Sequence, residues 1–357
     1  MNNVRAKESV HKAVLLNEVV DLLVTKWGEK GGQKSVSAKK LESKESTSTS
    51  SRTSASTTIP TYLDGTLGGA GHALAVAKAL GGKLNIIGLD RDQQALERAE
   101  RTLGGHCKTL ILKNENFRNL DKVLAERKIS GSTGAIGSIV STGSTTDLTT
   151  TTGVDMILLD LGISSDELDN SKKGFTFQKD EPLHMTMGEP EQYPFTAKDI
   201  VNKWDEEVIA NIIFGYAEEK FARRIARAIV SYRMKKQIET TMELAELVKL
   251  SVPGFYRRGR IHPATKTFQA LRIAVNDELG ALKEGLKKGY EVLNKGGRFA
   301  VISFHSLEDR IVKEFFREKL NDEAIIITKK PITAKEQEIL ENPRSRSAKL
   351  RVLEKTK

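Results

Sequence analysis

A glycine-rich turn between a strand-like run and a helical run is the feature that most constrains the fold. Residues 59–64 form an apolar run that ends in Asp64, and residues 65–71 then contain four glycines before a helical pattern over 72–80. Glycine lets the backbone approach a ligand closely, and a helix N-terminus offers free N–H groups. This arrangement predicts a nucleotide-like ligand at the end of a buried strand. A purely structural tight turn is the alternative.

Strand-like and helical segments alternate along much of the chain. Short apolar runs predict strands at 59–64, 84–90, 109–113, 154–160, 298–304 and 324–328. Helical patterns alternate with several of these runs, at 72–80, 93–103, 267–293 and 307–320. Such alternation predicts an α/β fold with a doubly wound, mostly parallel sheet. We expect Gly296 and Gly297 to follow the end of the third helix, and Ser306 with Asp309 to form a capping box for the fourth.

The alternation stops after the fourth strand. Residues 166–263 contain amphipathic helical patterns near 206–214, 218–233 and 241–252, so we expect a helical subdomain inserted into the α/β unit. This divides the chain into a first core segment (1–165), the inserted substrate-recognition subdomain (166–263) and a second core segment (264–357). Two Ser/Thr-rich stretches near 29–58 and 130–153 bury too little apolar surface to fold, and are expected to be mobile loops.

Composition narrows the classes of protein and partner. The 357 residues include a single cysteine, Cys107, which excludes a disulfide framework and a cysteine-rich metal site. No apolar run approaches the roughly 20 residues that span a bilayer, so we expect a cytoplasmic protein with no membrane partner. The net charge of +10 suits a polyanion such as nucleic acid, although solubility alone would also explain it.

Three of the expected strands end in an acidic residue, and these residues help to distinguish between SAM-like and dinucleotide ligands. Asp90 follows the second strand, where a carboxylate can accept ribose hydroxyls. Asp64 would lie near a dinucleotide's pyrophosphate, and like charges about 4 Å apart repel by about 4 kcal/mol at an effective dielectric near 20. The third glycine of a dinucleotide motif is replaced by Leu74. These features favour S-adenosylmethionine (SAM), which is cationic, over NAD.

Ten segments, in order along the chain, resemble the RsmH (MraW) family. They are His11–Leu16, Asp64–His72, Leu89–Asp92, Asn116–Phe117, Leu158–Gly162, Gly174–Phe177, Glu218–Ala222, His262–Ala270, Ser303–Arg310 and Asn342–Ser347. The resemblance covers nearly the whole chain outside the two Ser/Thr-rich stretches. It implies a Rossmann-like SAM-dependent methyltransferase fold and methylation of the exocyclic N4 of a cytidine in the decoding centre of 16S ribosomal RNA.

The resemblance also implies which residues contact the cofactor. With the loop residues argued above, the candidate SAM contacts are Asp64, Gly68, Ala70, Gly71, His72, Asp90, Phe117, Asp160 and Glu167. Phe117 would stack on adenine, although an ordinary core position is an equal alternative. Glu167 stands where the family has glutamine. We expect no metal.

Asp160, at the end of the fourth strand, is the candidate catalytic residue. The N4 lone pair of cytosine is delocalised into the ring, so an acceptor that binds an N4 hydrogen would orient the amine and take its proton. Methyl transfer itself is an in-line displacement that depends on positioning. The target base must be single-stranded or flipped out of a helix.

Cations of the helical subdomain suggest the RNA surface. They are Arg223, Arg224, Arg227, Arg233, Lys235, Lys236, Arg257, Arg258 and Arg260, with Phe255 and Tyr256 available for stacking. A solvated helix face is the alternative. The candidate substrate contacts are His184, Arg257, Arg258, Arg260, Lys266 and His305, with Arg344 and Arg346 as weaker candidates. His184 and Thr186 replace an Asp and an Arg of the family.

Three functions follow from these residues. The first is an RNA cytosine-N4 methyltransferase whose partner is 16S ribosomal RNA within the small ribosomal subunit. The others are an NAD-dependent oxidoreductase on a Rossmann fold, and a non-catalytic RNA-binding factor for ribosome assembly. The sequence does not show the oligomeric state, for which a homodimer is one alternative.

Overall fold

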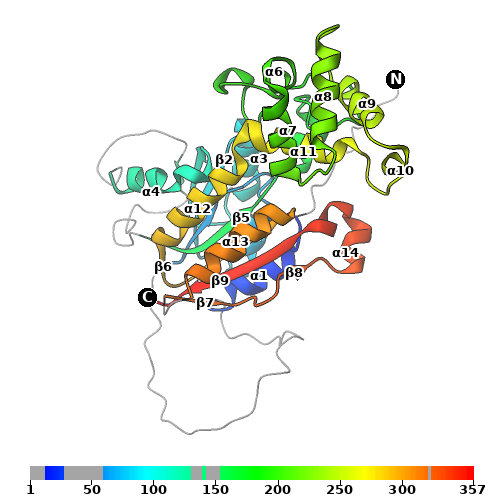
Figure 1. The fold of residues 1–357 in the computed structure, drawn as a ribbon. Coiled ribbons are helices and arrows are strands. Elements are labelled where there is room, and N and C mark those ends of the chain that lie inside the picture. Colours follow the sequence, from blue (N-terminus) through cyan, green and yellow to red (C-terminus); the bar gives the residue numbers. More distant parts are fainter. Residues whose placement is uncertain (1–12, 28–58, 130–138, 142–152, 321–322) are drawn as a thin grey trace, which may run out of the picture.

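A nine-stranded sheet forms the centre of the protein (Figure 1). The structure is a computed structural model that describes residues 13–27, 59–129, 139–141, 153–320 and 323–357. The strand order is β4-β3-β2-β1-β5-β6-β9-β7, and β8 pairs with β9. The predicted loop at 29–58 lies outside the described residues. Within the other Ser/Thr-rich stretch, Ile139–Ser141 forms β4, a strand that the sequence did not predict.

Five neighbouring strands of the sheet are parallel. They are β3 (Thr109–Asn114), β2 (Asn85–Asp90), β1 (Thr61–Asp64), β5 (Val154–Asp160) and β6 (Leu293–Ser303). The antiparallel strands are β4, β7 (Ala324–Ile326), β8 (Ile332–Thr333) and β9 (Lys349–Lys355). The order of the strands reverses between β1 and β5, which is where an open α/β sheet places its ligand.

Helices cover both faces of the sheet. Alternate residues of a strand point to opposite faces, so Tyr62 and Ile86 enter one apolar cluster while Leu63 and Ile87 enter the other. The first face carries α1 (Leu16–Val24), α2 (Gly71–Ala79) and α3 (Gln93–Leu103), and the second carries α4 (Leu120–Ile129), α12 (Glu278–Val292) and α13 (Ser306–Glu318). The predicted doubly wound α/β fold is confirmed.

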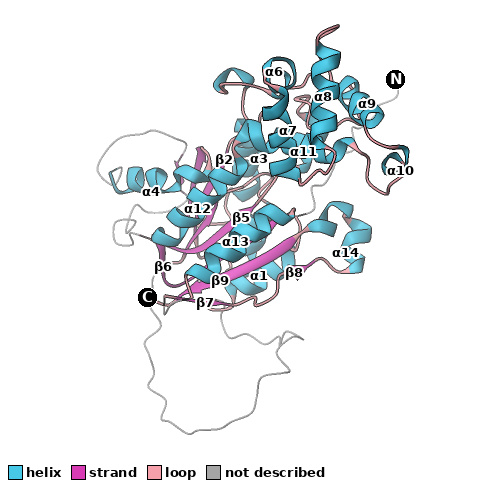
Figure 2. Ribbon diagram, in the orientation of Figure 1, coloured by secondary structure: helices cyan, strands magenta, loops and turns pink. Residues whose placement is uncertain are grey.

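A second group of helices lies next to the sheet (Figure 2), and it has an apolar core of its own. Its helices are α5 (Ser165–Asn170), α6 (Ala197–Lys203), α7 (Glu206–Ala217), α8 (Ala222–Arg233), α9 (Thr241–Ser251), α10 (Gly254–Arg257) and α11 (Ala264–Asn276). Although α11 follows the expected boundary at residue 263, its Phe268 and Leu271 belong to this core. The division of the chain into three segments stays a prediction.

Two local predictions were wrong. The single helix expected over 267–293 is two helices, because Asp277 adopts a left-handed conformation with φ 47° and ends α11. The strand β6 then starts at Leu293, so Gly296 lies inside a strand. The capping box of α13 is formed by His305 and Glu308, one residue before the expected pair.

The remaining elements are short. They are η1 (Phe117–Asn119), η2 (Pro190–Gln192), α14 (Glu336–Glu341) and η3 (Pro343–Ser347). The longest helix of the described chain, α12, has 15 residues, whereas a bilayer span needs about 20 apolar ones. Accordingly, none of the helices that the structure describes could cross a membrane.

Candidate active site

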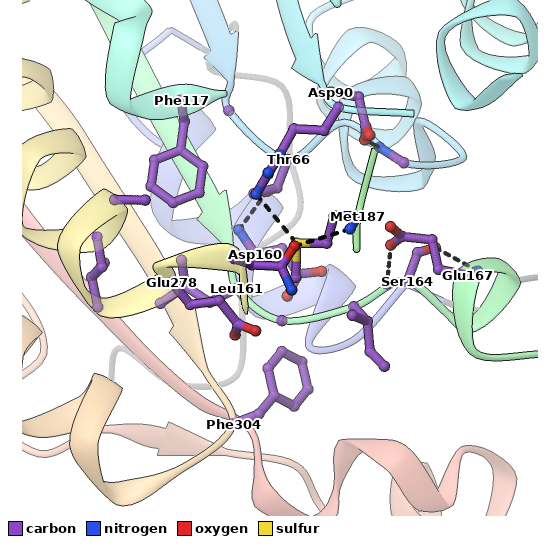
Figure 3. Close-up of a pocket in the computed structure, with 18 of the residues that line it drawn as sticks. Thr66, Asp90, Phe117, Asp160, Leu161, Ser164, Glu167, Met187, Glu278 and Phe304 are labelled. Atoms are coloured by element: carbon purple, nitrogen blue, oxygen red, sulfur yellow. Dashed lines mark hydrogen bonds between the residues drawn. The ribbon is translucent and has the colours of Figure 1, made fainter. Parts of the chain in front are cut away.

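A cavity opens where the strand order reverses, at the carboxyl ends of β1, β2 and β5 (Figure 3). Three parts of the chain that are distant in sequence meet around it. The sheet contributes its strand-end loops, the helical region contributes Met187 and Asn276, and the C-terminal segment contributes Asn342 and Arg344. Val14, just before α1, completes the wall. The position agrees with the site that the glycine turn predicted.

Backbone hydrogen bonds hold the glycine loop against the strand ends. Gly65 N donates to Leu158 O (3.0 Å), and Leu67 N donates to Leu89 O (3.0 Å). A Cβ on Gly65 would lie 2.4 Å from the Leu159 side chain, so only glycine fits. Gly68 has a φ of 49° and lines the cavity; its contact with SAM stays a prediction. The loop is therefore a fixed part of the wall before any ligand binds.

Asp90 connects the loop to the end of β2. Its Oδ2 accepts the Gly68 N–H (2.7 Å) and its Oδ1 accepts the Asp92 N–H (2.9 Å). Burial raises the pKa of this carboxyl above its ordinary value. The side chain also lines the cavity. Each oxygen keeps a second lone pair for a ligand hydroxyl.

Phe117 lines the cavity from η1 and is packed between two glycines. A Cβ on Gly285 of α12 would lie 2.5 Å from Phe117 Cδ2, and a Cβ on Gly65 would lie 3.0 Å from Phe117 Cβ. The two glycines thus allow the ring to lie against α12 and the loop. An aromatic ring fixed in this way offers a stacking surface to a flat ligand group.

Several expected cofactor contacts lie away from the cavity. Asp64 is 1% exposed, and its carboxylate accepts the Tyr62 hydroxyl (2.8 Å) and the Thr66 N–H (3.1 Å) beneath the loop. Burial raises its pKa to about 6. Our expectation that the Asp64 charge faces the ligand is therefore not met by this geometry. Ala70, Gly71 and His72 open α2 without lining the cavity, and His72 Nε2 lies 2.9 Å from Val14 O.

Asp160, at the end of β5, has an acceptor atom without a partner. Its backbone N–H donates to Thr66 Oγ1 (2.7 Å), and its Oδ2 lies 3.7 Å from His72 Nδ1. Among the described residues, no donor reaches its buried Oδ1. Burial, together with the charge of Glu308, raises its pKa to about 7. A cavity-lining carboxyl with this pKa can take a proton near neutral pH.

Glu167 lines the cavity from the first turn of α5. It forms a capping box with Ser164, in which Oε2 accepts the Ser164 N–H (2.9 Å) and Ser164 Oγ accepts the Glu167 N–H (3.1 Å). Burial and the nearby charge of Asp90 raise its pKa to about 7. The carboxyl is therefore close to half-protonated at neutral pH. The glutamine that the family has at this position would not titrate.

Three further carboxylates of the cavity wall, Glu115, Glu278 and Glu308, were missed by the sequence analysis. Arg272 makes two bonds to Glu278, at 2.7 and 2.8 Å. Glu308 Oε2 accepts the N–H groups of Phe304 (2.8 Å) and His305 (3.2 Å). They lie far from Asp160 along the chain, so their spacing gives no sign that they share its cavity. The only sequence signal for them was their place in or beside segments that resemble the family.

The same cluster brings possible metal ligands together. Ligand atoms of Glu278, His305 and Glu308 lie within 4.8 Å of one another. However, the buried Arg272 guanidinium already occupies both oxygens of Glu278, so a cation would have to displace it. The arrangement is that of a hydrogen-bonded ion-pair network. The absence of a metal stays a prediction.

The expected substrate contacts are not gathered at the cavity. Arg257 donates to Val252 O (2.9 Å) and Leu250 O (2.8 Å), so it closes the end of α9. Lys266 donates to Glu218 O (3.1 Å), and His305 caps α13. Arg258 and Arg260 are exposed near α10, which projects from the helical region (Figure 1).

The two departures from the family lie behind the wall. Thr186 is fully buried and its hydroxyl has no partner among the described residues, while His184 does not line the cavity. Met187, one residue after Thr186, is the side chain of this segment that reaches the cavity. Arg344, a weaker candidate, also lines it.

Comparison with known proteins decides the family. A profile of the MraW methylase family matches residues 8–356. The chain belongs to this family. It is 44% identical over 310 residues to the ribosomal RNA small subunit methyltransferase H of Brevibacillus brevis, with 82% of this chain and 91% of that protein covered. The protein of the same name from Acetivibrio thermocellus is 45% identical over 313 residues, covering 82% and 92%. That from Persephonella marina is 47% identical over 291 residues, covering 81% and 90%.

Membership of a methylase family bears on the alternatives that the sequence left open. It gives no support to an NAD-dependent oxidoreductase, which the glycine loop alone had allowed. It also gives no support to a non-catalytic assembly factor. The resemblance noted from the sequence segments is confirmed.

Proposed function

We propose that this protein transfers a methyl group from SAM to the exocyclic N4 of a cytidine in the decoding centre of 16S ribosomal RNA. The relatives named as ribosomal RNA small subunit methyltransferases support the reaction class and the RNA. The observation that carries the chemistry is Asp160, a carboxyl in the cavity wall whose pKa is raised to about 7 and whose Oδ1 has no partner among the residues that the structure describes.

The described residues fit SAM. Phe117, held between Gly65 and Gly285, would stack on the adenine, and Asp90 would accept the ribose hydroxyls. The carboxyl groups of the wall suit a ligand with a cationic amine and sulfonium. When bound, SAM supplies an electrophilic methyl group. The chain's own task is to hold the amine in line with it and to exclude water.

Asp160 would act on the amine. Its Oδ1 accepts one N4 hydrogen, which aims the nitrogen lone pair towards the methyl carbon. As the N–C bond forms, the proton passes to Asp160. The ionised carboxylate is the active form, so its pKa of about 7 allows it to act as a base in neutral solution and still to hold the proton afterwards.

The RNA would reach the cavity as an unpaired or flipped-out base. We place the rest of the RNA on the basic helical region, where Arg258, Arg260 and the exposed ring of Phe255 offer phosphate and stacking contacts. We also propose that the protein works in the cytoplasm on the small ribosomal subunit. A homodimer is a further proposal, which light scattering of the purified protein tests.

The deciding experiment is mass spectrometry of small-subunit RNA after incubation with the protein and labelled SAM. We expect one N4-methylcytidine per RNA. Asp160→Ala should abolish the label while SAM still binds in calorimetry. If the variant instead supports subunit assembly in cells as well as the wild type does and the wild type adds no methyl group, a non-catalytic assembly role replaces this proposal.

A further inference from the structure

We infer that Glu308 is a second acceptor for the substrate amino group, holding the hydrogen that stays on nitrogen while Asp160 receives the one that leaves. This inference rests on the proposed amine methylation. It concerns a residue that the sequence analysis did not single out, and it gives the cavity a means of selecting a base with an amino edge.

The fold brings the two carboxylates to the same cavity from neighbouring strands. Asp160 ends β5 and Glu308 lies in the first turn of α13, just after the neighbouring parallel strand β6. The two strands stay paired to their ends, because Asp160 is in register with Ile302 and Leu161 N donates to Ile302 O (2.9 Å). Both side chains line the same cavity.

Contacts on three sides hold Glu308 in place. The residue is 2% exposed, and its Oε2 accepts two backbone N–H groups, those of Phe304 and His305. His305 Nδ1 accepts the Glu308 N–H (3.4 Å), so the ring carries its hydrogen on Nε2, which lies 3.2 Å from Glu308 Oε1. The hydrogen bonds that the Glu308 carboxylate accepts from the described residues are both made to Oε2, so Oε1 can accept a substrate N–H.

The surroundings of Asp160 and Glu308 shift the pKa values of the two carboxyls in opposite directions. Burial alone would raise the pKa of Glu308, but the hydrogen bond and charge of His305, the Phe304 N–H and the charge of Arg272 outweigh it, and the net pKa is lowered. Burial and the charge of Glu308 raise that of Asp160 to about 7. Two neighbouring carboxyls whose pKa values are driven apart can divide the work of holding a hydrogen and taking a proton.

Other titratable groups near Asp160 do not replace Glu308. His72 of α2 lies 3.7 Å from Asp160 Oδ2, and Asp64 and Tyr62 of β1 are coupled to it by charge. These three side chains are buried beneath the glycine loop and do not line the cavity. Glu278 does line it, but its charge is balanced by the guanidinium of Arg272, which donates one N–H to each of its oxygens.

The reaction balances with these two acceptors. The N4 lone pair forms the new N–C bond, the S–C bond breaks, and sulfur keeps that electron pair as a neutral thioether. One N4–H bond breaks and its proton passes to Asp160. The other N4 hydrogen stays on nitrogen, bound to Glu308. A keto oxygen at this position, as in uracil, would face two acceptors and be rejected.

Glu308→Gln tests the inference, because glutamine also serves at this position of a capping box and so preserves the start of α13. We measure single-turnover methyl transfer to small-subunit RNA across a range of pH, with SAM affinity and the melting temperature measured in parallel. The expected result is a rate at the pH plateau that is lower by about 10- to 100-fold, since a charge-assisted hydrogen bond to the amine is lost. The acidic limb of the profile should also move to lower pH, because Asp160 loses its negative neighbour.

Asp309→Asn is the matched control. Asp309 lies in the same turn but pairs with Arg351 (2.7 Å) and Lys349 (3.3 Å) and does not line the cavity, so the rate and the limb should match the wild type. A Glu308→Gln protein that keeps the wild-type plateau, or one whose rate falls while the limb stays in place, would overturn the inference. If Glu308→Gln does not fold, Glu308→Asp takes its place, because aspartate also serves at this position of the capping box of α6. The shorter side chain keeps the charge but withdraws the acceptor, so the plateau rate should fall while the limb stays in place, and an unchanged plateau would overturn the inference. Failure of the wild type to methylate RNA would instead refute the proposed function.

Discussion

The ends of β2 and β5 each present an aspartate to the cavity, but the two carboxylates differ in what they are bonded to. Both oxygens of Asp90 accept backbone N–H groups, from Gly68 and from Asp92. Asp160 has an oxygen that no described donor reaches, and its pKa is raised to about 7. The carboxylate at the end of β2 is thus held in a fixed position by the backbone, whereas the carboxylate at the end of β5 has an oxygen available to accept a hydrogen bond.

This difference separates binding from chemistry. A carboxylate fixed by two N–H groups recognises a ligand with little reorganisation, which lowers the cost of binding. A buried carboxyl with an unsatisfied oxygen is costly to the folded protein, and such a cost is found where a group has to act on a substrate. Variants of the two ends should therefore fail in different ways.

The largest expected effect is that of Asp160→Asn. The amide keeps the size of the side chain but cannot take a proton, so methyl transfer should fall by about 100- to 10,000-fold while the SAM dissociation constant changes little. In the wild type, the rate should rise with pH through about 7 and then level off, because the ionised carboxylate is the active form. Rates from labelled SAM at several pH values check both points. Weakened SAM binding as the main defect would contradict the assignment.

Asp90→Asn should give the opposite pattern. An amide can accept only through its oxygen, so one of the two backbone hydrogen bonds that Asp90 accepts, from Gly68 and from Asp92, is lost together with a ribose acceptor. We expect the SAM dissociation constant to rise by about 10- to 100-fold, with the rate at saturating SAM nearly unchanged. Calorimetry and initial rates separate the two quantities. A large fall in the rate at saturating SAM would contradict the separate roles given to Asp90 and Asp160.

Glu167→Gln should make the protein without SAM more stable in alkaline solution. The folded pKa of about 7 exceeds the ordinary value of 4.5, so Glu167 favours folding below about pH 4.5, and this contribution is lost as the pH rises through 7. We expect the variant to gain about 1 to 2 kcal/mol in free energy of unfolding near pH 8 and little near pH 4.5. Denaturant titrations at the two pH values measure it. An equal gain at both values would mean that burial of the charge is not the cause.

Gly285→Ala should weaken SAM binding from outside the loop. Its new methyl group would lie 2.5 Å from the Phe117 ring, so the ring must shift out of its slot. We expect the dissociation constant to rise by about three- to tenfold, since overpacking displaces rather than removes the contact. Gly215→Ala on α7 is the control, because no atom of the described neighbouring residues lies within 4 Å of its added Cβ, and affinity should not change. Equal affinities for the two variants would remove the role given to Phe117.

Much of the fold could be predicted because its signals are local. The apolar runs before Asp64, Asp90 and Asp160 became the parallel strands β1, β2 and β5, since a buried strand needs a short apolar run with a polar stop. The break between α11 and α12 could not be read in this way. Both segments have helical patterns, and the turn at Asp277 is fixed by α11 packing in the helical core while α12 packs on the sheet.

The sequence by itself determined the α/β class and, through the family resemblance, the methylase family, and it predicted the edge of the sheet at which the cavity opens. Only the tertiary structure decided which carboxylates face the cavity. Asp64 is turned away by Tyr62 and Thr66, while Glu308 is brought to the same cavity as Asp160 from a distant part of the chain. The physical reason is that strand and turn signals depend on near neighbours, whereas a side chain's burial, partners and pKa depend on every segment that packs around it.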